Sequence, residues 1–149
     1  MKKFKYRLET LLKVKAQLEK EKQREHAHAL QKVFDQKDRL LSIDRTRQDN
    51  MDRQRECLVG SLSLAEMLIY SRFFMKLKRD TVTGREILKG LEKDEDKKRR
   101  ALVQAAKQRK IYEKLKEKQR DKYNAEIELQ EKKELDEIAT NIFRTNNKK

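Results

Sequence analysis

The fold is decided by the stretch Leu58-Val59-Gly60-Ser61-Leu62-Ser63-Leu64-Ala65-Glu66. Gly60 can adopt the left-handed conformation that often ends a helix, and the serines after it are candidate N-caps. Ser63 and Glu66 have the spacing of a capping box, in which each side chain bonds the backbone N–H of the other residue. The stretch therefore predicts that one helix ends near Leu58, that the chain turns over about residues 59–63, and that a second helix starts near Leu64.

The composition on both sides of this turn favours long helices over a globule. Of 149 residues, 44% are charged and only 36% are apolar, and there is no Trp, so the large side chains can fill a thin seam but not a deep core. Disorder is the first alternative, because the chain is polar and carries a net charge of +14. However, helix formers dominate, Pro is absent and Gly occurs three times, which favours helix.

Apolar spacing predicts the seam between the two helices. Residues at steps of three, four and seven, with one slip of register, predict the inward face of the first helix. They are Phe4, Leu8, Leu11, Leu18, Ala27, Leu30, Phe34, Leu41 and Met51, and the rhythm continues at Leu58, Leu62, Ala65 and Ile69. The candidates further along the second helix are Ile87, Leu91, Ala101, Ala105, Tyr112, Leu115 and Leu129.

We therefore predict an all-α fold, a long antiparallel two-stranded coiled coil with unequal helices, forming a single domain over residues 1–149. The first helix covers about residues 4–58, the second about 64–140, and residues 141–149 form a disordered tail. Gly84 and Gly90 should loosen the second helix without ending it, since each costs about 1 kcal/mol relative to Ala. Folded back at Gly60, the first helix ends opposite about Lys118, so the end of the second helix overhangs and is free to enter a partner.

The sequence offers no arrangement typical of catalysis. Glycine occurs only at positions 60, 84 and 90, so no Gly-rich phosphate loop can form, and we expect neither enzyme activity nor a cofactor. His26 and His28 point about 200° apart on a helix, which argues against a shared metal. The single cysteine, Cys57, is interpreted as a small seam residue, and we expect a cytoplasmic protein because there is neither a disulfide pair nor an apolar membrane span.

The positive charge leaves alternatives open. It is spread along the chain, with local density at residues 97–100 and 107–122, as expected for a solvated helix face. A basic helical arm that binds nucleic acid is one alternative, although no base-reading motif accompanies the charge and we expect no specific nucleic-acid recognition. A generic structural scaffold, or a contact with a membrane surface that is peripheral at most, is another. The sequence does not decide between a monomer and a dimer.

An aromatic cluster near the turn is the candidate binding site. Phe73 and Leu77 share one helix face, and Tyr70 and Phe74 share another, so they cannot all lie inside a two-stranded seam. In one interpretation, one set packs against Leu58 and the neighbouring Val59 across the turn. In the other, the cluster is an exposed anchor for another protein.

The chain resembles the FliJ family of flagellar export proteins over almost its whole length. The resemblance rests on the opening Phe4-Lys5-Tyr6-Arg7-Leu8-Glu9-Thr10-Leu11-Leu12, on Ser63-x-x-Glu66 followed by Tyr70, Phe73 and Leu77, and on the ending Leu135-Asp136-Glu137-Ile138-Ala139. The order of these motifs, the length and the position of the turn together carry the identification.

The resemblance implies a function in flagellum biogenesis and motility. Members of the family are cytoplasmic antiparallel coiled coils similar to the central stalk of rotary ATPases. They insert into the hexameric ring of the type III export ATPase, contact the cytoplasmic domain of the export gate at the inner membrane, and recycle export chaperones. The resemblance carries gate binding over to Phe73 and Leu77, while Asp80 and Gly84, the next positions of that face, depart from the family pattern.

Overall fold

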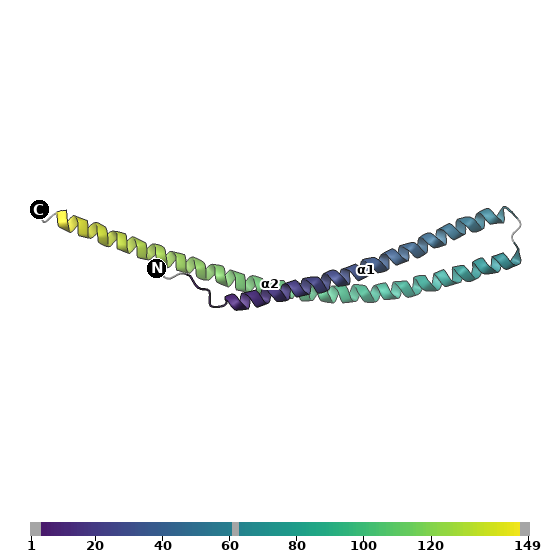
Figure 1. Cartoon of the computed structure of the whole chain (residues 1–149), viewed down its shortest axis with the longest axis horizontal. Helices are drawn as coiled ribbons and strands as arrows, with labels where there is room; N and C mark the ends of the chain where they lie inside the picture. Colours follow the sequence, from purple (N-terminus) through teal and green to yellow (C-terminus); the bar gives the residue numbers. More distant parts are fainter. Residues whose placement is uncertain (1–3, 61–62, 147–149) are drawn as a thin grey trace. The chain divides into compact units, whose positions relative to one another are not determined.

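The protein is an antiparallel helical hairpin (Figure 1). The computed structural model describes residues 4–60 and 63–146. Helix α1 spans Glu9–Leu58 and helix α2 spans Leu64–Asn146, with 50 and 83 residues respectively, and the described residues contain no strand. The predicted all-α coiled-coil hairpin with unequal helices is confirmed.

The outer ends of both helices differ from the prediction. Helix α1 begins at Glu9 rather than near residue 4, because Tyr6 is buried and its carbonyl caps the helix by accepting a bond from the Glu9 N–H at 3.3 Å. Helix α2 continues to Asn146, so residues 141–146 are helical rather than a disordered tail. Neither Gly nor Pro follows Gly90 to stop the helix. Within the predicted turn, residues 61 and 62 lie outside the described part, as do residues 147–149 of the predicted tail.

The start of α2 has the predicted capping box. The carboxylate of Glu66 accepts hydrogen bonds from the backbone N–H of Ser63 at 2.8 Å and from its hydroxyl at 2.9 Å, and the Glu66 N–H donates to the Ser63 hydroxyl at 3.3 Å. These bonds lower the pKa of the Glu66 carboxyl group, and the bond from the Ser63 backbone N–H has a larger effect than the bond from the Ser63 hydroxyl. This contribution to stability is present above the ordinary pKa of a glutamate and is lost as the pH falls through the lowered value.

Contacts divide the chain into two compact units. One consists of residues 20–103, and the other combines the described residues 4–19 and 104–146. In the first unit, the Gln36 amide donates to the Gly84 carbonyl at 3.0 Å, and His26 Nε2 lies 2.8 Å from a Glu95 carboxylate oxygen. Residues later in α1 thus pair with residues earlier in α2, as an antiparallel hairpin requires.

In the second unit, α1 and the residues before it pack on α2 with the same antiparallel direction. Lys15 donates to the Gln108 side chain at 2.7 Å, and Lys116 lies 2.6 Å from a Glu9 carboxylate oxygen. Residues 4–8, here called the N-terminal clasp, lie against α2. The buried Tyr6 donates its hydroxyl to the Tyr112 carbonyl at 3.0 Å, and the ring centroids of Phe4 and Tyr123 are 5.5 Å apart.

The predicted register of the seam is wrong over most of its length. The inward positions of α1 advance by alternating steps of four and three, without a slip, through Ala29, Val33, Gln36, Leu40 and Ile43. The predicted Leu8, Leu11, Leu30, Phe34 and Leu41 are instead exposed, as are Ala27, Leu58, Ala65 and Ile69, while Leu62 lies outside the described residues. On α2, Leu91, Ala105 and Tyr112 lie inward as predicted, but Ile87, Ala101, Leu115 and Leu129 are exposed.

The reason is that apolar residues occur in adjacent pairs along α1. Leu11 is followed by Leu12, Ala29 by Leu30, Val33 by Phe34 and Leu40 by Leu41, which gives two stripes about 100° apart on the helix. In the middle of the hairpin the structure buries the smaller member, Ala29 or Val33, and exposes its larger neighbour. Small seam residues let two helix backbones approach closely, and Gly84 is one such residue: a Cβ there would lie 2.8 Å from Leu40 Cδ2 and 3.2 Å from Gln36 Nε2.

A matched pair of glycine substitutions tests this close approach. Gly90→Ala should raise the free energy of unfolding by about 1 kcal/mol, because the site is helical and nothing lies within 4 Å of the added Cβ. Gly84→Ala has the same helix-propensity gain but must displace Leu40 and Gln36, at a cost of about 1–3 kcal/mol. In urea unfolding, the Gly84 variant should therefore be less stable than the Gly90 variant. Equal stabilisation by both substitutions would contradict a tight contact at Gly84.

A second pair of substitutions tests the hydrogen bond that holds the N-terminal clasp. Tyr6→Phe removes the bond to the Tyr112 carbonyl and should cost about 0.5–1.5 kcal/mol, seen as faster amide exchange over residues 4–12. Tyr112→Phe is the control, because the acceptor is a backbone carbonyl that the substitution retains. Comparable exchange in both variants would show that the clasp does not depend on this bond.

Candidate protein-binding surfaces

The predicted aromatic cluster forms a connected group on α2. The rings of Tyr70 and Phe74 stack with centroids 6.5 Å apart, and Phe73 meets Phe74 edge to face at 6.3 Å. All three aromatic side chains are half-buried, whereas Leu77 is only 7% exposed. The cluster thus has a buried aliphatic residue and three partly accessible rings.

The face to which the resemblance assigns gate binding is turned largely inward. Leu77 and Gly84 both lie in the buried seam, and the carbonyl of Leu77 accepts a bond from the Thr81 hydroxyl at 2.8 Å. Leu58 is 56% exposed and Val59 is 91% exposed, so the alternative in which the cluster packs against these two residues does not describe the structure.

Across from the cluster lies Cys57, which is exposed rather than buried in the seam. The pKa of the Tyr70 hydroxyl is raised above its ordinary value. The largest cause is partial burial of the side chain, and the next is the nearby Cys57 side chain. Tyr70 therefore stays protonated at neutral pH and presents a hydroxyl donor as well as a ring face.

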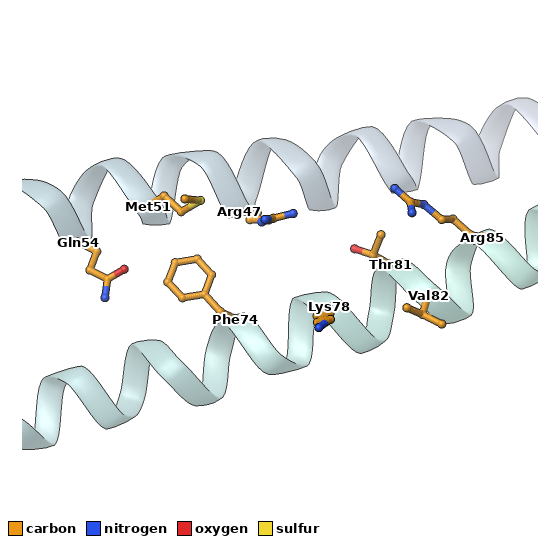
Figure 2. A pocket seen from close by; sticks show the side chains of 8 residues that line it. All are labelled: Arg47, Met51, Gln54, Phe74, Lys78, Thr81, Val82 and Arg85. Atoms are coloured by element: carbon orange, nitrogen blue, oxygen red, sulfur yellow. The ribbon is translucent and has the colours of Figure 1, made fainter.

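A groove between the helices was missed by the sequence reasoning. Its volume is about 510 Å³, and Figure 2 shows Arg47 and Met51 of α1 facing Phe74 and Thr81 of α2 across it. The lining residues are Arg47, Met51, Gln54, Phe74, Lys78, Thr81, Val82 and Arg85. The spacing of Arg47, Met51 and Gln54 by four and three residues could have revealed the α1 wall, but only with the correct register.

The C-terminal part of α2 is a third exposed surface. Every side chain that the structure describes from residue 128 to 144 is exposed. Apolar residues nevertheless recur there at helical spacing: Leu135, Ile138, Ala139, Ile142 and Phe143. This stretch is the overhang that the sequence predicted, and its apolar stripe was not recognised beforehand.

The two histidines have different surroundings. His26 contacts Glu95, while His28 is exposed. Over residues 4–60 and 63–146, no three His, Cys, Asp or Glu side chains come together in a way that could hold a metal ion. No helix in the same ranges is long and apolar enough to cross a membrane.

Comparison with known proteins places the chain in a family. A family model described as "Flagellar FliJ protein" matches residues 4–148. Searches of curated proteins and of solved structures gave no match. The match covers nearly all of the 149 residues, including both helices, the turn and the N-terminal clasp. The chain therefore belongs to the FliJ family of flagellar proteins.

Proposed function

We propose that this chain is a stalk-like coiled coil that inserts its open end into the ring of the flagellar export ATPase and promotes assembly and activity of that ring. Membership of the FliJ family makes the chain a component of flagellar protein export. The observation that carries the finer proposal is the overhang: α2 continues as an exposed helix beyond the residues that contact the N-terminal clasp. A single helix with a free apolar stripe is narrow enough to enter a ring and has a surface to bury there.

The stalk contributes asymmetry rather than a catalytic group. One elongated helix inside a ring of identical subunits contacts them unequally, so it can favour some conformations of those subunits over others. Between residues 124 and 144, six Asp and Glu side chains stand against three Lys and Arg, so the overhang is acidic although the whole chain is basic. The lining that receives it should therefore combine apolar and cationic residues.

The aromatic cluster is the proposed contact with the export gate. Tyr70, Phe73 and Phe74 supply partly accessible rings, which are common anchors of protein interfaces. Leu77 supports this surface from inside the seam, since it is nearly fully buried. We further propose that the chain acts in the cytoplasm, is held near the inner membrane by the export apparatus, and exchanges export chaperones there.

Removing the overhang tests the stalk proposal. The full-length chain should raise ATP turnover by the purified export ATPase and its assembly into hexamers. A chain ending at Tyr123 keeps the residues that contact α1 and the clasp, so it should retain a folded hairpin by circular dichroism but lose most of the stimulation. Full stimulation by the shortened chain, or none by the intact chain, would rule out insertion of the overhang.

Alanine substitutions separate gate binding from packing. Phe73→Ala should weaken binding to the cytoplasmic domain of the gate by about tenfold or more with a small change in Tm, because the ring is partly accessible. Leu77→Ala should lower Tm strongly, since deletion of a buried Leu side chain costs about 2–5 kcal/mol. Met75→Ala is the control, because Met75 is 59% exposed. If Phe73→Ala binds the gate normally, the cluster is not the gate contact.

A further inference from the structure

The groove between α1 and α2 has a chemical character that the packing of the hairpin does not require. Three of its eight lining residues, Arg47, Lys78 and Arg85, are cationic, and none is acidic. Among the described residues, no ion pair involves any of these three side chains. The apolar lining residues are Met51 of α1 and Phe74 and Val82 of α2. Such a surface suits an apolar segment flanked by carboxylates.

The groove is open because of the residues that face each other in this part of the seam. Near Gly84 the helices approach closely, but between residues 47–54 and 74–78 the groove is lined by the long side chains of Arg47, Met51, Gln54, Phe74 and Lys78. These side chains are too long to allow the same approach, and the ribbons of α1 and α2 diverge toward the turn (Figure 1). Apolar surface therefore stays accessible on both walls (Figure 2).

The C-terminal stripe of α2 has the complementary character. Leu135, Ile138 and Ile142 follow one another at three and four residues, with Phe143 beside them, and all are more than half exposed. At 100° per residue, these apolar residues cover an arc of about 140°, and Glu134 and Asp136 lie on its two edges. The described structure contains no ion pair for either carboxylate.

We propose that the groove binds the C-terminal stripe of a second copy of this chain, so that copies associate head to tail. The dimensions agree: Phe74 to Arg85 extends about 16 Å along α2, and Leu135 to Phe143 extends about 12 Å. Ile138 and Ile142 contact the apolar lining residues, while Glu134 and Asp136 reach the cationic side chains of Arg47, Lys78 and Arg85. One copy contributes its groove and the other its stripe, so the interface is heterologous. The first copy still has a free stripe and the second a free groove, and both can bind further copies.

The charges argue for this occupant over a lipid surface. An amphipathic helix that binds an anionic membrane carries Lys and Arg beside its apolar face, whereas this stripe is flanked by carboxylates. Self-association through the groove is a separate activity from insertion into the ATPase ring. The two would compete for the same stripe, so head-to-tail copies would be a form of the protein that is not engaged with the ring.

Two variants of the full chain test the interface, one on each side. The groove variant carries Arg47→Glu and Arg85→Glu, which reverse two exposed charges. The stripe variant carries Ile138→Gln and Ile142→Gln, which remove apolar surface at positions that are 55% and 56% exposed. Circular dichroism should show unchanged helicity for both, since neither alters a buried residue.

Sedimentation equilibrium at low ionic strength gives the readout. The mass of the unaltered chain should rise above 18.0 kDa with concentration, and each variant alone should associate at least tenfold more weakly. Mixed together, the groove variant supplies an intact stripe and the stripe variant an intact groove, so the mixture should form a one-to-one complex that stops at two chains.

Other outcomes overturn the proposal. If the unaltered chain stays monomeric, no second copy occupies the groove. If the groove variant associates as well as the unaltered chain while the stripe variant does not, the stripes pair with each other instead. If the mixture forms no complex, the two surfaces do not bind one another. The groove variant should still stimulate the export ATPase, so a failure of self-association leaves the stalk proposal to its own test.

Discussion

The structure depends on how closely two helices can approach along a seam of alternating four- and three-residue steps. Where the inward residues are small, as at Ala29, Gly84 and Ala105, side chains from both helices are buried. A chain with 44% charged residues has few other ways to remove apolar surface from water. The buried polar residue Gln36 fits because the carbonyl of Gly84 lies within hydrogen-bond reach. That hydrogen bond favours the register in which Gln36 of α1 lies opposite Gly84 of α2.

The sequence predicted local features of the fold well and the long-range packing poorly. The turn and the Ser63–Glu66 capping box depend on neighbouring residues only, and both ends of the turn were located correctly. The seam register depends on which of two adjacent apolar residues faces the other helix. Pairs such as Val33 and Phe34 leave that choice open to a single-sequence reading. The shape of the opposite helix decides which residue is buried, and that shape cannot be deduced from the residue spacing of one helix.

The same limit decides which of the candidate binding surfaces could be predicted from the sequence. The aromatic cluster was found because its residues are close in sequence, yet the burial of Leu77 could not be separated from the exposure of its neighbours. The groove was missed because its walls come from residues about 30 positions apart, Met51 and Val82. The overhang was predicted from helix lengths alone. Its acidic flanking residues indicate a binding surface only because the structure shows the whole stretch to be exposed.

The N-terminal clasp has a consequence for how the chain acquires its structure. Its hydrogen bond joins residues 106 positions apart, whereas the capping box at Ser63 joins residues three apart. Closing so long a loop costs more entropy than forming a local turn. During synthesis, moreover, Phe4 and Tyr6 leave the ribosome long before the tyrosines against which they pack. The hairpin should therefore zip from its turn outward, and the residues made first complete their contacts last.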